Sequence, residues 1–316
     1  EPSIDVWAMD VARFGDYASP QYGTIKSSEN YERRFIMTFP NETLPKGRKQ
    51  KTTALYDRFV NQGAVMGDSF GLENVLWFAN NKEDAHEEPT IKRSRSHDYV
   101  SKEVINVREN VGLIEVANFS KHEFKGPDAR KFLDHIMAGR LPKPGRISLS
   151  PMLSYRGKLC GDLTVACLDE NEFMVFGSGA AQEMHRRWFE SHLDKFNLSY
   201  SNRSDEYHGL SIAGPNSRKV LEKIVRDDVS NEKFKFRDSR RMFVGGVPAI
   251  INRISFTGEL GYEIYVAPHY QLKLYEELME AGKEFNIKPF GGRALMSMRL
   301  EKNWGAWTLD YRPDFT

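Results

Sequence analysis

Three residues in this sequence combine a reactive side chain with a position that could hold a ligand: Asp162, Glu263 and Arg293. Asp162 stands at the start of a mostly apolar, strand-like run, GDLTVACL. In a partly apolar site, desolvation would raise the pKa of this carboxyl group and suit it to proton transfer. A turn-end aspartate that caps backbone amides is the alternative interpretation, and the sequence leaves both open.

Glu263 lies in the run ISFTGELGYEIYV, residues 254–266, whose last part alternates like a strand. The alternation puts Gly261, Glu263 and Tyr265 on one face. Glycine permits close approach of a flat ligand, and a neighbouring carboxylate can accept two parallel hydrogen bonds from an amidine-like edge. A solvated glutamate is the alternative. Of the two acids in the run, the alternation selects Glu263 as the inward-facing one and leaves Glu259 at the turn.

Arg293 lies in the first turn of a predicted helix, directly behind two glycines. Cations are more favourable at the other end of a helix, so this arginine indicates an anionic partner, either a ligand or a structural acid. Motifs for other cofactors are missing, since the sequence has no GxGxxG after a strand, P-loop, HExxH or Cys-x-x-Cys. His185 and His192 share a helix face but have no third ligand at matching spacing. The sequence therefore predicts no metal site, and no flavin or nucleotide site of its own.

The composition sets limits on size, partners and location. A chain of 316 residues predicts two domains or lobes, and 40% hydrophobic with 28% charged residues is typical of a globular protein. The net charge of +1 provides no basic field for nucleic acid or acidic lipid. No apolar run approaches the roughly 20 residues needed to cross a bilayer. We expect no nucleic-acid or membrane partner, and a cytoplasmic location, or the mitochondrial matrix in a eukaryote.

The elements that must position the three residues follow from apolar spacing and turn residues. Residues 80–98 predict a surface loop, followed by a helix that passes through Gly112 into a strand. In residues 1–50, prolines disfavour long helices except around residues 6–14. The remaining clear elements are predicted strands at 147–153, 159–167 and 172–177 and predicted helices at 180–196 and 270–285.

An internal repeat joins two parts of the chain. HEFKGPDARKFLDHIM begins at His122 and GLSIAGPNSRKVLEKIV begins at Gly209. Each has a short strand, Gly-Pro and then a helix, and proline in the first turn needs no amide donor. Asp128 and Asn216 are predicted to cap the free amides of that turn. Coincidence is the alternative to duplication. Duplication predicts two pseudo-equivalent α+β lobes, and a cleft between lobes is a common ligand site.

Taken together, five runs resemble the aminomethyltransferase (glycine-cleavage T-protein) family: VGLIEVANFSKHEFKGPDARKFLDHI, GRISLSPMLSYRGKLCGDLTVACL, GLSIAGPNSRKVL, ISFTGELGYEIY and GGRALMSMRLEK. Within the family, the resemblance is strongest to the folate-binding C-terminal half of dimethylglycine and sarcosine dehydrogenases. Two earlier runs are similar to the segment that joins the flavin half to the folate half of those enzymes: IDVWAMDVARFG and TTALYDRFVNQGAVMGDSFGLENVLWFA.

The resemblance implies an α+β fold with two pseudo-repeated lobes of antiparallel sheet, and helices, around a central folate cleft. The family's C-terminal β-barrel lobe would be missing. Residues 1–50 would be a junction segment from a preceding flavin-domain half, and residues 51–316 an aminomethyltransferase-like folate-binding region, incomplete at its C-terminus. Because the chain starts at Glu1 without a methionine, we expect a piece of a longer polypeptide.

The resemblance also implies a tetrahydrofolate site. Asp162 matches the family's aspartate beside the reactive pterin nitrogens, where it would orient the cofactor and assist proton transfer. Glu263 matches the glutamate that grips the amino-pyrimidinone edge of the pterin, and Arg293 matches an arginine that helps to hold the cofactor. Tyr265 and Gly261 share the face of Glu263 and are expected to bind the cofactor with it. FAD is expected only in a preceding domain.

The implied function is the capture of an iminium or formaldehyde as methylenetetrahydrofolate, as part of a dimethylglycine or sarcosine dehydrogenase-like enzyme. The flavin-domain half would be a partner, in the same or another chain. One alternative is a free-standing T-protein-like demethylase of another methylated metabolite, and a second is a non-catalytic folate-binding or assembly module. The family often has Arg-Asp in its last motif, whereas Arg293 is followed by Ala294 here, so a supporting acid is lost or supplied from elsewhere.

Overall fold

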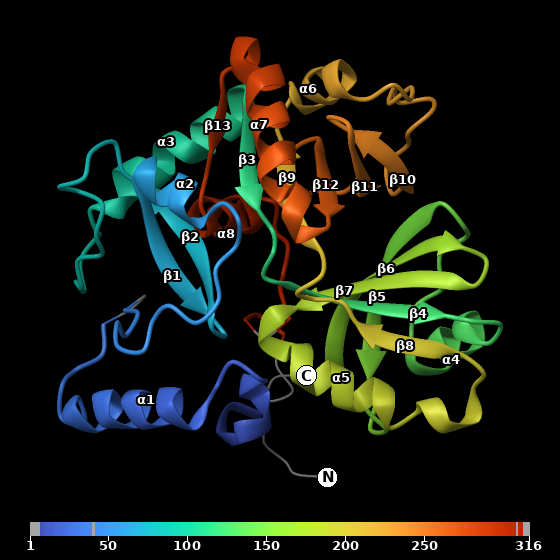
Figure 1. Ribbon diagram of the computed structural model, residues 1–316, viewed down its shortest axis with the longest axis horizontal. Helices are drawn as coiled ribbons and strands as arrows, with labels where there is room; N and C mark the ends of the chain where they lie inside the picture. The colour runs from blue at the N-terminus through green and yellow to red at the C-terminus, as the bar shows by residue number, and fades with distance from the viewer. Residues whose placement is uncertain (1–6, 40–41, 308, 312–316) are drawn as a thin grey trace.

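The computed structural model describes residues 7–39, 42–307 and 309–311. These residues form a mixed α+β fold with a six-stranded sheet, a five-stranded sheet and a two-stranded hairpin (Figure 1). All strand pairs are antiparallel except the pairing of β13 with β3. The predicted fold class is confirmed, and the described part of the chain contains no closed barrel.

The six-stranded sheet is built from segments that are far apart in the sequence. Its strands lie in the order β10-β11-β12-β9-β3-β13. Helices α6 and α7 cover its outer face, where their apolar side chains join those of the sheet. The bounds are β3 Val111–Glu115, β9 His208–Ala213, α6 Ser217–Ile224, β10 Ser239–Val244, β11 Val247–Asn252, β12 Gly261–Val266, α7 Gln271–Gly282 and β13 Ile287–Pro289.

The five-stranded sheet is built from one continuous stretch of chain inserted between β3 and β9. Its strands lie in the order β5-β6-β7-β4-β8. Helices α4 and α5 pack on its outer face around Phe132 and Phe189. The bounds are β4 Phe119–Lys125, α4 Ala129–Ile136, β5 Arg146–Leu153, β6 Leu159–Asp169, β7 Glu172–Ser178, α5 Gln182–Glu190 and β8 Ser199–Asn202.

The two sheets repeat one topology. The order β5-β6-β7-β4 in one matches β10-β11-β12-β9 in the other, and the strand-Gly-Pro-helix units β4–α4 and β9–α6 occupy equivalent places. The glycine before each helix has a positive φ, 135° at Gly126 and 131° at Gly214, which other residues rarely adopt. The predicted duplication is therefore present in the structure.

The predicted caps of these two helices are wrong. Neither Asp128 nor Asn216 makes a side-chain capping bond to its helix. Asp128 instead accepts a hydrogen bond from the backbone N–H of Asn197 at 3.0 Å and pairs with Lys131 at 2.8 Å. Because the Asp128 carboxylate binds the Asn197 amide and not the amides of its own helix, it links the start of α4 to the chain before β8.

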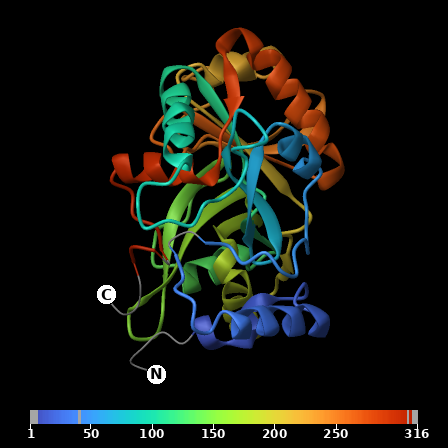
Figure 2. The ribbon, with the colours of Figure 1, turned by 90° about the vertical axis from the view of Figure 1, so that its left-hand side faces the viewer.

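The N-terminal part contains a longer helix than the prolines predicted. Helix α1, Pro20–Glu32, lies along the base of the molecule, whereas residues 7–14 form only two short 3₁₀ turns (Figures 1 and 2). Pro20 starts the helix instead of breaking it, because it occupies the first turn and Ser19 accepts a hydrogen bond from the N–H of Tyr22. Beyond it lie α2 Tyr56–Asn61, β1 Ala64–Ser69 and β2 Leu72–Phe78.

The inner faces of the two sheets pack against each other. Their shared core, called here the interlobe core, includes Phe176 from β7 and Tyr265 from β12. Helices α3, Ser96–Glu109, and α8, Gly292–Glu301, complete it with Val107, Ala294 and Met298. The sheet faces that carry Glu263 and Asp162 therefore belong to the contact between the lobes.

Two chain segments join the lobes: residues 116–118 lead from β3 to β4, and residues 203–207 lead from β8 back to β9. At the other edge, backbone hydrogen bonds join the start of β5 to the start of β10, from the N–H of Ile147 to the carbonyl of Arg237 and from the N–H of Ser239 to the carbonyl of Gly145. The lobes are thus joined through backbone at both edges of their contact.

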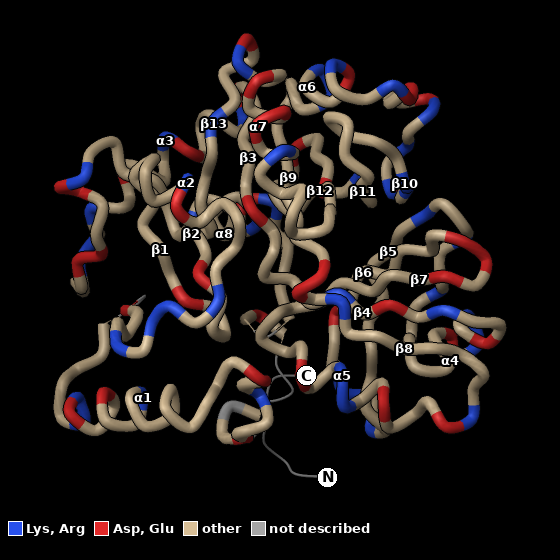
Figure 3. The backbone as a smooth tube through the Cα atoms, in the orientation of Figure 1, with Lys and Arg blue, Asp and Glu red and all other residues tan. Residues whose placement is uncertain are grey.

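Charged side chains of both signs are distributed over both lobes (Figure 3). Among the helices that the structure describes, none is both long enough and apolar enough to span a bilayer.

Candidate functional site

Glu263 sits on the inner face of β12 with a single recorded side-chain partner. Its Oε2 accepts a hydrogen bond of 2.9 Å from the hydroxyl of Tyr265, which lies two residues further along the same face. The predicted alternation is confirmed, because Tyr262, Ile264 and Val266 point into the outer core instead. Burial raises the pKa of Glu263 to about 7, and the Tyr265 hydrogen bond offsets only part of that effect.

The nearest polar neighbours of Glu263 come from the adjoining strands. Ser211 of β9 and Asn252 of β11 stand directly opposite it in the sheet, so the three side chains form one row. Asn252 is fully buried, and its Oδ1 accepts a 2.7 Å hydrogen bond from Ser239. Its Nδ2 is buried and has no hydrogen-bond partner among the described residues. A buried orphan donor is costly, and here it lies beside a buried acceptor.

Asp162 sits on the facing sheet, in β6. Leu163 and Val165 point to the outer core, so Asp162 and Thr164 occupy the inner face. The Asp162 carboxyl is partly buried, and desolvation alone raises its pKa. This direction agrees with the proton-transfer interpretation. A turn-end cap would show a hydrogen bond to a backbone amide, and none is recorded among the described residues.

An aromatic stack connects the two sheet faces. The rings of Phe176 and Tyr265 lie 4.6 Å apart between centroids and are stacked. Thr164 is paired with Phe176 in the sheet and is two residues from Asp162. Glu263 and Tyr265 from one lobe and Asp162 from the other thus lie on the two sheet faces that pack against each other.

Gly261 begins β12, but the space beside it is occupied. A Cβ atom at Gly261 would lie 2.7 Å from the Cβ of Ser255, so this loop residue fills the position expected for a flat ligand. Glu259 is held at the turn, where it accepts a hydrogen bond of 2.7 Å from Arg108. The interpretation of Glu259 as the turn residue and Glu263 as the inward residue fits this arrangement.

Arg293 is on the first turn of α8, and its guanidinium already has partners. It pairs with Glu87 at 2.9 Å and donates to the hydroxyl of Ser96 at 2.6 Å. Glu87, an acid from outside the motif, therefore pairs with Arg293. It supplies the carboxylate that Ala294 cannot provide in place of the aspartate of the family's Arg-Asp pair. The structure does not bring Arg293 into the row that contains Glu263.

The start of α8 is fixed by a buried carboxylate that the sequence did not single out. Glu103 of α3 accepts hydrogen bonds from the N–H of Phe78 at 2.7 Å and of Gly291 at 3.0 Å. Any larger residue at position 291 would displace the backbone, because its Cβ atom would lie 2.2 Å from the backbone oxygen of Leu76. Burial raises the pKa of Glu103 to about 7.

Two further ionisable side chains lie where the lobes are connected, the buried Lys121 and the half-buried Glu115. Lys121, on β4, is fully buried, and burial lowers its pKa to about 7. Glu115, at the end of β3, receives a hydrogen bond from Gln271, and burial raises its pKa to about 7. Sequence reasoning missed both. The available signal was Lys121 in the strand-like run NFSKHEFKG, where it shares a face with the apolar Phe119.

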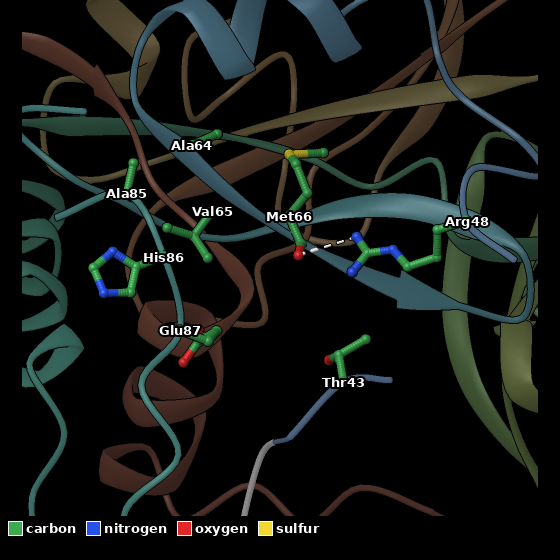
Figure 4. A pocket seen from close by; sticks show the side chains of 8 residues that line it. All are labelled: Thr43, Arg48, Ala64, Val65, Met66, Ala85, His86 and Glu87. Carbon is green, nitrogen blue, oxygen red and sulfur yellow. Dashed lines mark hydrogen bonds between the residues drawn. The ribbon is translucent and has the colours of Figure 1, made fainter. Parts of the chain in front are cut away.

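Neither of two surface cavities contains Asp162 or Glu263. The smaller, about 240 Å³, is lined by residues of β1 and by Arg48, His86 and Glu87 (Figure 4). In it, Arg48 hydrogen-bonds the carbonyl of Met66 and pairs with Glu73, while Glu87 is the partner of Arg293. The cations at this cavity are therefore already neutralised by carboxylates of the chain itself.

The larger cavity, about 710 Å³, lies between the N-terminal segment and the five-stranded lobe. Its charges are mixed, with Arg13, Lys51 and Arg186 beside four acids: Asp16, Glu183, Asp205 and Glu206. One of its walls is residues 202–206, whose other side contacts Lys121 through the carbonyl of Ser204.

Two domain families match this chain. The family described as GCVT N-terminal domain matches residues 55–316, and the family described as FAD dependent oxidoreductase central domain matches residues 1–53. Human mitochondrial dimethylglycine dehydrogenase is 34% identical over 318 residues, covering 99% of this chain and 36% of the relative. Human mitochondrial sarcosine dehydrogenase is 26% identical, covering 99% of this chain and 39% of the relative. The chain therefore spans little more than a third of these relatives.

Among solved structures, the glycine cleavage system aminomethyltransferase T from Bartonella henselae has the same fold. It superposes with a TM-score of 0.70 at 23% identity, over 84% of this chain and 66% of that chain.

Proposed function

Because the chain belongs to the aminomethyltransferase family of the GCVT N-terminal domain, we propose that it performs tetrahydrofolate-dependent one-carbon transfer in a dimethylglycine or sarcosine dehydrogenase-like enzyme. One observation carries the proposal: the Glu263 carboxyl group, on the inner face of its sheet, lies next to the Asn252 amide, whose Nδ2 has no hydrogen-bond partner among the described residues. This row offers an acceptor and a donor side by side.

The residues present fit the edge of a pterin. That edge has adjacent N–H donors, which a carboxylate fork accepts, and an exocyclic carbonyl oxygen, which can accept a hydrogen bond from an amide N–H. Glu263 would bind the donors, Asn252 would face the oxygen, and Tyr265 would orient the Glu263 carboxyl group through its hydroxyl. The orphan Nδ2 of Asn252 would then gain the partner that it lacks in the described residues.

Asp162 would hold and move the proton. Burial raises the pKa of the Asp162 carboxyl group toward neutral pH, and a group whose pKa lies nearer the working pH is better able both to donate and to accept a proton. Tetrahydrofolate, when bound, supplies the nitrogen that takes up the one-carbon unit. Asp162 would orient that nitrogen, while the packed interlobe contact excludes water and keeps the reacting groups close together.

Arg293 and Gly261 remain part of the proposed cofactor set with less direct support. Arg293 would reach an anionic part of the cofactor only after exchanging its bonds to Glu87 and Ser96. Gly261 would admit the ring only if Ser255 moved away from it.

We further propose that residues 1–50 are the junction to a flavin-bearing half and residues 51–316 the folate region. The match of residues 1–53 to an FAD dependent oxidoreductase domain supports this division. Oxidation of the methylated amine would then take place outside these residues, and the iminium or formaldehyde would arrive from there. The two human relatives are mitochondrial by name, which is compatible with the matrix location.

Calorimetry with tetrahydrofolate tests the proposal, together with an assay of the one-carbon-loaded folate product formed from formaldehyde. We expect saturable binding at one site per chain and product formation faster than in the absence of protein. Absence of binding would refute the folate assignment. Binding without any acceleration would favour a binding module without turnover.

A further inference from the structure

A fully buried lysine ties together the two segments that join the lobes. Lys121 lies on the inner face of β4, directly opposite Phe176 in the sheet. Its Nζ donates a hydrogen bond of 2.7 Å to the carbonyl of Ala117 and one of 3.2 Å to the carbonyl of Ser204. Ala117 belongs to the first connection between the lobes, residues 116–118, and Ser204 to the second, residues 203–207.

The backbone of Lys121 adds two more bonds to the second connection. Its N–H donates to the Ser204 hydroxyl at 3.0 Å, and its carbonyl accepts from the N–H of Arg203 at 2.7 Å. The Ser204 hydroxyl in turn donates to Asn202 at 2.6 Å. Four hydrogen bonds therefore converge on one residue at the crossing point of the two connections.

Lys121 also lies against the proposed cofactor site. Its Nζ is 6.0 Å from the centre of the Tyr265 ring, and the hydroxyl of that ring is bonded to Glu263. The charges that act on Lys121 come from three segments: Glu115 on β3 and Asp205 in the second connection favour the ammonium form, and Lys51 in the N-terminal part opposes it. The ammonium group therefore stands between the connections and the face that carries Glu263.

Burying the ammonium group costs desolvation free energy, which an apolar side chain of equal length would not cost. This cost indicates that the two hydrogen bonds of the ammonium group have a role of their own. What an apolar side chain cannot do is donate to two carbonyls at once. Without a donor, the carbonyls of Ala117 and Ser204 would lose their partner and separate. The lysine is thus the group that holds both connections at a fixed distance.

We propose that Lys121 is a positioning residue of the one-carbon transfer site: by tying residues 116–118 to residues 203–207 beneath the Tyr265 ring, it sets where Tyr265 and Glu263 stand relative to Asp162. This inference rests on the proposed folate function. Lys121 acts through Tyr265 and does not itself contact the cofactor.

The first test replaces the ammonium group but keeps the length of the side chain. Lys121→Met should lower the affinity for tetrahydrofolate about tenfold or more. Lys125→Met is the matched control on the same strand, because Lys125 is 45% exposed and pairs only with Glu123 and Glu172. The control should bind like the parent. Equal affinities for parent and Lys121→Met would overturn the proposal, even if the variant melts at a lower temperature.

A second test asks whether the effect passes through Tyr265. Tyr265→Phe removes the hydroxyl that orients Glu263 but keeps the ring. If Lys121 acts by positioning this pair, adding Lys121→Met to Tyr265→Phe should lower affinity by less than the product of the two single effects. Multiplicative losses would mean that Lys121 acts independently of the site. Lys121→Arg, which keeps the charge and the donors, should restore part of the affinity.

Hydrogen exchange makes the outcome independent of ligand binding. In the parent, the amides of Lys121 and Arg203 should exchange slowly. In Lys121→Met, exchange should accelerate selectively at residues 116–118 and 203–207 and not in α4. Rapid exchange at these amides in the parent would refute the tie itself. A parent that shows the tie but no folate binding would leave the tie in place and refute the proposed function.

Discussion

The rings of Phe176 and Tyr265 belong to different sheets, yet they stack with their centroids 4.6 Å apart. Phe176 neighbours Lys121 and Thr164 within its own sheet, and Tyr265 is bonded to Glu263. This contact therefore links the sheet that carries Asp162, the proposed proton-transfer residue, to the sheet that carries Glu263, the proposed cofactor-binding residue. Movement of either ring would change both.

Glu263→Ala should weaken tetrahydrofolate binding by about 1–3 kcal/mol, the usual cost of leaving a buried partner unpaired. Calorimetry measures the effect directly. Glu259→Ala is the matched control, since Glu259 lies in the same run but is paired with Arg108 at the turn. Unchanged affinity in the Glu263 variant would remove the pterin-edge assignment.

Asp162→Asn should slow formation of the loaded folate product much more than it weakens binding, because the amide keeps the shape and loses the proton. A loss of about 10²–10⁴-fold in rate is typical of removing a general acid or base. Asp169→Asn, at the exposed far end of the same strand, should leave the rate unchanged. Equal losses in rate and affinity would show that Asp162 only binds.

The double variant Asn252→Leu with Ser239→Ala should weaken folate binding while stability stays near that of the parent. Replacing both partners of a buried hydrogen bond by apolar groups is nearly neutral, and the orphan donor is removed as well. Calorimetry and urea unfolding measure the two effects. Full affinity in the double variant would show that the orphan amide does not face the ligand.

Arg293→Met and Glu87→Gln separate a cofactor contact from a structural ion pair. Each substitution should lower the free energy of unfolding by about 1–3 kcal/mol, because it leaves the other, half-buried member of the ion pair without its charged partner. Only Arg293→Met should lower folate affinity, because Glu87→Gln leaves the guanidinium in place. If the two variants bind folate equally well, Arg293 is structural.

The stability of the protein should depend on the buried carboxyl groups between pH 4.5 and 7. Burial raises the pKa of Glu263 to about 7, so the folded state binds a proton more tightly than the unfolded state. Its contribution is complete below the ordinary pKa of a glutamate and is lost as the pH rises through about 7. Urea unfolding at pH 5 and pH 8 should show Glu263→Gln gaining on the parent by roughly 1–3 kcal/mol at the higher pH. A difference that does not change with pH would contradict this assignment.

Local patterns predicted three strands of the five-stranded sheet and the direction in which the side chains of β12 alternate. The alternation around Glu263 and the three strands from 147 to 177 agree with the structure because period and turn residues are properties of neighbouring residues. The repeat agrees at the level of topology, since each strand-Gly-Pro-helix unit is built locally.

What sequence reasoning missed depends on contacts between distant segments. The pairing of Arg293 with Glu87, the orphan amide of Asn252 and the four bonds to Lys121 all join residues that only the fold brings together. The helix at Pro20 was missed for a different reason: proline was treated as a breaker where it served as the first residue.

The insertion of one lobe inside the other also bears on how the chain reaches its native state. Glu115 and Leu210 are paired in the β3–β9 ladder, but the entire five-stranded lobe lies between them in the sequence. Once that contiguous lobe has formed, its two ends already lie side by side at Ala117 and Ser204. The loop that remains to be closed is then short, and a tenfold reduction in loop length lowers the entropic cost by about 2 kcal/mol. Folding of the inserted lobe would thus bring β3 and β9 together and favour assembly of the six-stranded sheet.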